Sequence, residues 1–276
     1  MIKKKINLIK KPLVAYIAYA PFGLVKFKKF ILSYLKYSSG EKHDLLICYK
    51  GFSDYKEIFK WKSIVPSKHI EFFEKNEKND FDIGSYFRIA EKYKDRHILY
   101  ISSHQTINCN KWLKIFKNHY KENSVICSSA VYTSISSQFL NFYYSQFTKF
   151  QQLRWGIKHW LNVKYFPNPH IRTVGFLIKA KDLLSLKIDK NKFIRKIETN
   201  YFESGRKGLS NQLLKRGFNL ILVNSDNKSF RIRDWGKSKT FYLDNQEKII
   251  FNDNQTYTYF KASQKKKIKM NKSVWG

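Results

Sequence analysis

Short apolar runs alternate along the chain with stretches in which apolar residues recur every three or four positions. An uninterrupted apolar run predicts a buried strand, and the longer spacing predicts a helix with one buried face. The predicted strands cover residues 13–20, 44–49, 70–73, 97–101, 124–131, 171–178 and 218–223. The predicted helices cover residues 25–37, 82–93, 111–120, 180–187, 191–201 and 207–216. This alternation predicts an α/β fold with a mixed, mostly parallel sheet flanked by helices.

An aromatic stretch at residues 136–166 interrupts the alternation. Its aromatic residues are interleaved with Lys149, Arg154, Lys158 and Lys164. Two interpretations stay open: an amphipathic helix that rests at a membrane interface, or a helix that packs in the core. No repeat or linker divides the chain, so we expect one domain over residues 1–260. Residues 261–276 are expected to form a basic, mobile tail.

The charge of the chain points to a negatively charged partner. Among 276 residues, 53 are Lys or Arg and 21 are Asp or Glu, for a formal net charge of +32. A codon bias toward Lys, Asn and Ile is the alternative explanation. Specific recognition of phosphates and bases usually uses arginine, and most of the basic residues here are lysines. We therefore favour an anionic membrane surface as a possible partner and regard nucleic acid as unlikely.

The cysteines and the N-terminus bear on the cellular compartment. Cys48, Cys109 and Cys127 are too few for a disulfide framework and have no zinc-site spacing, which indicates a reducing compartment. Residues 1–20 have the outline of a signal peptide, but their apolar run is short. We expect a cytoplasmic protein, and a peripheral position at the inner face of the cell membrane stays open.

Two segments that stand next to predicted strands carry candidate chemistry. Asp80 and Asp82 could hold a divalent cation, or Asp82 could instead cap the helix that it opens. The two prolines of residues 167–173 favour an extended loop that brings His170 and Arg172 to the start of a strand. A turn with satisfied polar groups is the alternative for this loop.

A third polar segment covers residues 202–206. Glu203 and Arg206 are three positions apart and lie on nearby faces at a helix start, with Gly205 between them. They could contact a ligand or form a structural ion pair. The dinucleotide, P-loop and serine-hydrolase signatures GxGxxG, GxxxxGK[ST] and GxSxG are absent from the sequence.

Several of these segments resemble a known family. Residues 82–90, residues 97–104 and Trp112-Leu113, in this order, resemble the first half of GT-A glycosyltransferases of the family-2 type. Residues 167–173, 202–206 and 253–256 resemble bacterial polysaccharide glycosyltransferases of the O-antigen and capsule kind. The resemblance spans roughly residues 13–260, with a donor half at about 13–135 and an acceptor half at about 136–260.

The resemblance implies a GT-A-like fold and a hexosyltransferase-like, inverting enzyme. Such an enzyme moves a sugar from a nucleotide-sugar donor to a glycan or lipid-linked glycan acceptor. Glu203 would be the general base that takes the proton of the attacking hydroxyl. The residues implied at the donor are Ala20, Pro21, Gly23, Asp82, Ser102, Ser103 and His104. Those implied at the acceptor or the diphosphate are His170, Arg172 and Arg206.

The chain departs from this family at the metal-binding motif. The Asp-x-Asp of the family falls on Ser102-Ser103-His104, and serines are poor ligands for Mg²⁺ or Mn²⁺. Either His104 holds a divalent cation with help from elsewhere, or cationic side chains neutralise the diphosphate. Residues 151–155 spell the QxxRW motif of processive synthases, but they precede Glu203, the wrong order for that motif.

Two other functions stay open on the sequence alone. A basic nucleic-acid-binding protein would use the net charge directly, and its binding would fall steeply with salt. A catalytically inactive glycosyltransferase-like scaffold would explain the missing Asp-x-Asp, and it would bind no nucleotide sugar.

Overall fold

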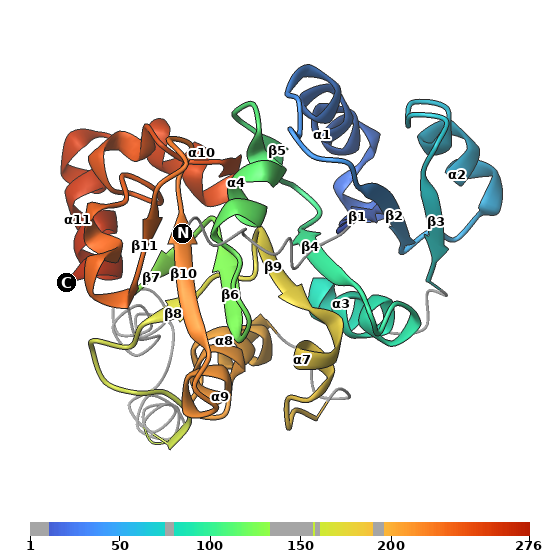
Figure 1. Cartoon of the computed structure of the whole chain (residues 1–276). Coiled ribbons are helices and arrows are strands. Elements are labelled where there is room, and N and C mark those ends of the chain that lie inside the picture. The colour runs from blue at the N-terminus through green and yellow to red at the C-terminus, as the bar shows by residue number, and fades with distance from the viewer. Residues whose placement is uncertain (1–10, 75–79, 133–156, 158–160, 190–195) are drawn as a thin grey trace, which may run out of the picture.

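A mixed sheet of eight strands forms the centre of the molecule (Figure 1). The computed structural model describes residues 11–74, 80–132, 157, 161–189 and 196–276. The strands lie in the order β11-β10-β6-β9-β4-β1-β2-β3, and all but β9 and β11 run in one direction. Their bounds are β1 Leu13–Tyr19, β2 Asp44–Lys50, β3 Ile70–Phe73, β4 His97–Ile101, β6 Ser124–Cys127, β9 Phe176–Lys179, β10 Asn219–Val223 and β11 Ser229–Phe230. The predicted fold class, a mixed and mostly parallel α/β sheet, is confirmed.

Helices cover both faces of this sheet because its strands are apolar on both faces. In β1, Val14, Tyr16 and Ala18 belong to the core on one face, and the residues between them belong to the core on the other. The first face carries α1 Leu24–Lys36, α2 Tyr55–Lys62 and α4 Trp112–His119. The second face carries α3 Phe81–Lys92, α7 Ala180–Leu184, α8 Lys196–Ser204 and α9 Leu209–Lys215.

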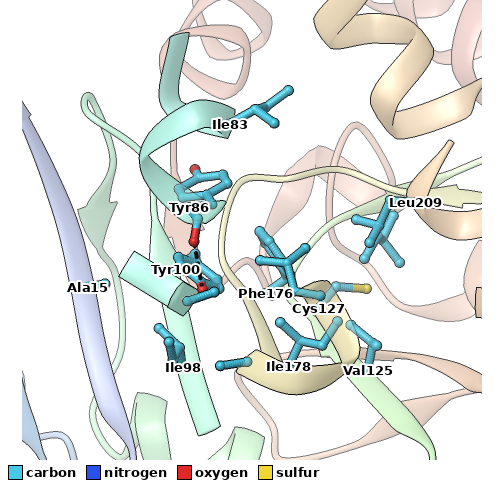
Figure 2. Packing of buried hydrophobic residues seen from close by; sticks show 14 of the residues in the cluster. Ala15, Ile83, Tyr86, Ile98, Tyr100, Val125, Cys127, Phe176, Ile178 and Leu209 are labelled. Atoms are coloured by element: carbon cyan, nitrogen blue, oxygen red, sulfur yellow. Dashed lines mark hydrogen bonds between the residues drawn. The ribbon is translucent and has the colours of Figure 1, made fainter. Parts of the chain in front are cut away.

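Tyr86, Tyr100 and Phe176 pack among aliphatic side chains in the core on the second face, as Figure 2 shows. The rings of Tyr100 and Phe176 stack with centroids 5.1 Å apart, and Tyr86 packs against both. The buried hydroxyl of Tyr100 donates to the carbonyl of Tyr86 at 3.1 Å, so no polar group is left without a partner there. These contacts join α3 to two neighbouring strands.

The structure divides two strands that the sequence analysis predicts as continuous. The segment at 124–131 forms β6 and then β7 Ala130–Val131, and the segment at 171–178 forms β8 His170–Ile171 and then β9. In the second of these segments, β9 begins directly after Gly175, whose φ of +78° only glycine adopts readily. There β7 and β8 leave the main sheet and pair with each other. A second ribbon pairs β5 Thr106–Ile107 with β12 Phe251–Asn252.

The basic segment after residue 260 forms a helix that packs on the protein. After α10 Asn254–Phe260 comes α11 Gln264–Trp275. Val274 is buried, and the indole N–H of Trp275 donates to the carbonyl of Phe241 at 3.0 Å. The expected tail is corrected here, because two apolar residues near its end anchor it to the core. Within the described ranges, no helix combines the length and the apolar character that a membrane span needs.

The start of α3 is held by a buried ionic network at the ends of β2 and β3. The Nζ atom of Lys50 lies 2.5 Å from Asp80 Oδ1 and 3.5 Å from Glu74 Oε2. The guanidinium of Arg88 donates to both carboxylates, at 2.6 Å to Asp80 and 2.7 Å to Glu74. Burial disfavours the charge on Asp80, but hydrogen bonds and charges from Arg88 and Lys50 outweigh it and lower the pKa of that carboxyl.

The network corrects the expectation that Asp80 and Asp82 hold a cation together. Asp80 is occupied by two cationic side chains, and the carboxylate of Asp82 contacts a different loop. Asp82 is also not the cap of the helix. Helix α3 begins at Phe81, so Asp82 lies in its first turn.

A glycine-to-alanine pair tests the role of this network. A Cβ atom at Gly84 would lie 1.9 Å from Asp80 Oδ2, whereas one at Gly236 would meet no atom within 4 Å. We expect Gly84→Ala to lower the free energy of unfolding by about 2 kcal/mol, because Asp80 must move away from Lys50 and Arg88. Gly236→Ala is the matched control and should stay within about 0.5 kcal/mol of the parent. Urea unfolding measures both variants, and equal stabilities would contradict the assignment.

Candidate active site

The reversal of strand order in the sheet marks a place for a ligand. From β1 the chain moves outward to β2 and β3, and it then returns to the other side of β1 as β4. Ligands of open α/β sheets bind beyond the carboxyl ends of the strands at such a reversal. The residues that follow β1 and β4 there are the 3₁₀ turn Ala20–Phe22 and the segment Ser102-Ser103-His104.

A cavity of about 710 Å³ lies at this edge. Its volume is in the usual range for small-molecule sites. Part of its wall comes from the first half of the chain, and the rest includes β8, α8 and the segment before α10. The predicted site residues that line the cavity are Pro21, Asp82, Ser102, Ser103, His104, His170, Arg172 and Glu203. Residues 20, 23 and 206, also predicted, do not line it, and Arg206 is exposed.

The carboxylate of Asp82 faces the loop that follows β4. It accepts hydrogen bonds from the backbone N–H of Ser103 at 3.3 Å and from the hydroxyl of Ser103 at 3.2 Å. The carbonyl of Ser103 in turn accepts from the buried hydroxyl of Tyr16 in β1 at 2.9 Å. Three elements, β1, α3 and the β4 loop, therefore fix this side of the cavity.

Two polar atoms beside Asp82 are buried in the cavity wall and have no hydrogen-bond partner among the described residues. They are the hydroxyl of Ser102 and Nδ1 of His104. Burial lowers the pKa of His104, although the nearby carboxylates of Asp82 and Asp253 oppose the shift. A buried polar atom without a partner is costly.

Glu203 reaches the cavity from α8 on the opposite wall. Its Oε1 atom accepts hydrogen bonds from both the backbone N–H of Thr173, at 2.8 Å, and the hydroxyl of Thr173. The carbonyl of Thr173 accepts from the hydroxyl of Tyr86 at 3.0 Å. The carboxylate thus has a fixed orientation and is held by a residue that is itself held by α3.

His170 is buried beside this carboxylate. Its Nδ1 lies 2.7 Å from the carbonyl of Asn168, which can only accept, so Nδ1 carries the hydrogen. Burial lowers the pKa of His170; the hydrogen bond to Asn168 and the charge of Glu203 oppose this shift, and Arg172 adds to it. The ring is therefore neutral at pH 7, and its Nε2 atom is a hydrogen-bond acceptor.

Arg172 connects β8 to the C-terminal segment. Its Nη2 atom donates to Asp253 Oδ2 at 2.7 Å, and Nη1 donates to the hydroxyl of Ser129 at 3.2 Å. The guanidinium lies over the ring of Phe241, 3.9 Å from its centroid. Asp253 is buried and also caps α10 through the backbone N–H of Thr256. Arg172 is thus held in a single position at the cavity wall.

The cavity residues do not fit a tightly bound divalent cation. In the part of the chain that the structure describes, no group of three or more His, Cys, Asp or Glu side chains is placed to hold a metal ion. Where a carboxylate would be needed, Ser102 and Ser103 offer hydroxyls, and the Asp82 carboxylate is shared with Ser103. Mg²⁺ and Mn²⁺ prefer carboxylate and water oxygens. The possible metal role of His104 therefore finds no supporting ligand set.

Sequence reasoning missed several cavity residues. Thr173 lies in the segment that carries His170 and Arg172, but only the fold shows that it binds Glu203. Asp253 stands in a segment that the resemblance includes, and nothing in the sequence pairs it with Arg172. Further missed residues include Lys50, Tyr86, Lys196, Thr199, Asn200 and Phe241. Most of the aromatic stretch at 136–166 lies outside the described residues. The QxxRW motif at 151–155 lies wholly outside them.

Comparisons with known proteins return structural likenesses only. No family model and no curated protein matches the chain. Mouse xyloside xylosyltransferase 1 aligns at 11% identity over 73% of this chain and 78% of that one, with a TM-score of 0.39. The bifunctional glycosyltransferase WbbM aligns at 11% identity over 78% of this chain but only 38% of its own, with a TM-score of 0.42.

A third likeness is to the mannosyltransferase Ktr4p of S. cerevisiae in complex with GDP. It aligns at 11% identity over 76% of this chain and 68% of that one, with a TM-score of 0.34. All three are glycosyltransferases by name. At such low scores, the function of this chain must be argued from its own cavity.

The buried histidine gives the site a pH dependence that stability measurements can detect. Below pH 6.5, an unfolded chain protonates His170, whereas the folded chain, with its lowered pKa, does not. The unfolded state then binds more protons, so stability falls as the pH decreases. We expect His170→Gln to reduce this fall between pH 7.5 and pH 5.5, by up to about 1.4 kcal/mol per pH unit.

The free energy of unfolding of the parent and of His170→Gln is measured at several pH values. These measurements separate the contribution of packing and hydrogen bonding from that of protonation. At pH 8 the imidazole is neutral in both states, so the difference between variant and parent reports the lost packing and hydrogen bond. The change in this difference at lower pH reports protonation. An unchanged difference across the range would show that His170 is not held neutral.

Proposed function

We propose that the protein is a glycosyltransferase that uses a nucleotide-sugar donor. A single observation carries the proposal. The cavity at the strand-order reversal joins a donor-side wall, with Asp82, Ser103 and His104, to an opposite wall that presents an oriented carboxylate, Glu203. Transfer between two substrates needs a cavity that can hold both, with a base in reach of the acceptor. The order of motifs that resembles GT-A enzymes supports the same conclusion.

In the proposed reaction, Glu203 is the general base. The hydroxyl oxygen of the acceptor forms a bond to the anomeric carbon of the donor sugar while the bond from that carbon to the diphosphate breaks. The hydroxyl proton passes to Glu203, and the electron pair of the broken bond leaves with the diphosphate. Thr173 engages Oε1, so Oε2 is the oxygen that we assign to the proton transfer.

The outcome of this reaction is inversion, because the acceptor attacks the face of the sugar opposite the diphosphate. The acceptor is a glycan or a lipid-linked glycan. His170, neutral and next to Glu203, accepts a hydrogen bond from an acceptor hydroxyl through Nε2. On the donor side, Pro21 and Phe22 lie beside the nucleotide, and Asp82 contacts its polar groups.

The diphosphate in this proposal is neutralised by side chains of the chain itself. Arg172 and Lys196 line the cavity, and the charge of Arg172 also acts on His104. Charge-assisted hydrogen bonds from an ordered arginine stabilise a developing phosphate charge. The same observation opposes the inactive scaffold, because the missing Asp-x-Asp is accompanied by other groups that can bind a phosphate.

Glu203→Gln tests the base directly. We expect it to bind nucleotide sugar as tightly as the parent and to lower kcat by about 100- to 10,000-fold, because the amide keeps the shape but cannot accept a proton. Glu91→Gln, at an exposed position of α3 that does not line the cavity, is the charge-matched control. Full transfer activity in Glu203→Gln would exclude this role.

Chelation tests how the diphosphate is held. In a thermal-shift panel of UDP-, GDP-, dTDP- and CMP-sugars, we expect one donor to stabilise the protein equally with Mn²⁺ and with EDTA. Arg172→Lys should lower the affinity for that donor about tenfold, because lysine cannot keep both hydrogen bonds and the stacking on Phe241. Loss of the thermal shift in EDTA would show that a metal ion is required.

If no nucleotide sugar stabilises the protein while RNA does so in a salt-sensitive way, the nucleic-acid alternative holds.

A further inference from the structure

Helix α1 exposes apolar side chains on its outer face. Val25, Leu32 and Leu35 are 71%, 56% and 62% exposed. At 100° per residue, these three lie within one side of the helix. Lone exposed aliphatic residues are common, but three on one face of a single helix form a patch. Phe22, which directly precedes the helix, is a further exposed apolar side chain, at 42%.

The inner face of α1 already has its partners. Phe27, Phe30 and Ile31 are buried in the core, where the ring of Phe30 stacks on Tyr16 with centroids 3.7 Å apart. The outer residues are thus not needed to hold the helix on the sheet. The sheet covers only this inner face, and it leaves the aliphatic side chains of the outer face uncovered.

The polar residues on α1 define the chemistry of the second partner. The helix carries Lys26, Lys28, Lys29 and Lys36 and contains no Asp or Glu. Lys28, Lys29 and Lys36 are exposed and border the apolar side chains. Within the described ranges, none of the four lysines forms an ion pair. The surface made by Val25, Lys28, Lys29, Leu32, Leu35 and Lys36, called here the α1 surface, combines exposed aliphatic and lysine side chains on one side of the helix.

We propose that the α1 surface docks the protein onto an anionic phospholipid bilayer. The aliphatic side chains enter the boundary between headgroups and acyl chains, while the lysines extend to the lipid phosphates. A second copy of the chain fits this surface poorly. Each copy has a formal net charge of +32, and two α1 surfaces would bring their lysines together without an acidic partner.

Docking through α1 also sets where the cavity opens. Phe22 lines the cavity immediately before α1 begins, and Lys26 donates to Asn254 of the cavity wall at 2.9 Å. The cavity therefore lies next to the end of the helix that would rest on lipid. If the glycosyltransferase function proposed above holds, this placement favours a lipid-linked acceptor. The docking itself does not depend on that function.

Vesicle flotation with the full chain tests the proposal without any assay of activity. We expect binding to vesicles of phosphatidylcholine with phosphatidylglycerol, and little binding to phosphatidylcholine alone. Lys28→Gln/Lys29→Gln/Lys36→Gln should weaken binding about 100-fold, because each lysine near an anionic surface contributes about a factor of five. The charge-matched control is Lys265→Gln/Lys269→Gln/Lys272→Gln on α11, which should retain most of the binding.

The apolar part of the surface is tested by Leu32→Gln/Leu35→Gln, with Leu161→Gln/Ile268→Gln as the control at equally exposed positions. We expect the first pair to reduce binding at least tenfold and the second to leave it unchanged. Equal losses in the α1 and α11 lysine variants would show binding by net charge alone and overturn the proposal. Size-exclusion chromatography with light scattering completes the test, since a dimer broken by the leucine variants would assign the surface to a second copy.

Because flotation and sugar transfer are measured separately, their failures are distinguishable. Loss of lipid binding with intact transfer to a water-soluble acceptor would leave the enzyme function in place. Lipid binding with no nucleotide-sugar binding would leave the docking surface in place.

Discussion

The common direction of most strands in the sheet is the constraint on which the candidate site depends. Parallel strands end at the same edge, so the loops after β1 and β4 meet there although about eighty residues separate them. The antiparallel strand β9 begins at this edge, and it brings the segment with His170, Arg172 and Thr173 to the same place. Two halves of the chain thus contribute to one cavity.

Buried polar contacts then determine how accurately the cavity is built. Lys50 and Arg88 hold Asp80 at the start of α3, and α3 in turn positions Asp82 toward the β4 loop and Tyr86 toward Thr173. A displacement at the start of α3 would therefore move both Asp82 and Tyr86, and with them the contacts to the β4 loop and to Thr173. Buried ion pairs of this kind contribute little net stability but give a defined geometry, since a broken pair leaves an uncompensated charge.

The electrostatics of the cavity differ from those of the surface. The chain is strongly basic, yet the cavity places Asp82, Asp253 and Glu203 near two histidines whose pKa values are lowered by burial. Arg172 is neutralised in part by Asp253. Outside the cavity, α1 carries exposed lysines on the same side as exposed aliphatic residues. The cavity and the surface of α1 therefore differ in chemical character, with carboxylates and neutral histidines in the first and lysines with aliphatic side chains on the second.

The sequence by itself determined the class of fold and most of the candidate residues. Apolar runs and helical spacing are local properties, and they correctly predicted β3 at its bounds and α1 within one residue at each end. Tertiary structure decided what depends on distant partners. Gly175 divides the expected strand, Val274 and Trp275 turn the expected tail into a packed helix, and Thr173 reaches Glu203 across thirty positions. Periodicity records which side of an element is buried, but not which residue of another element it meets.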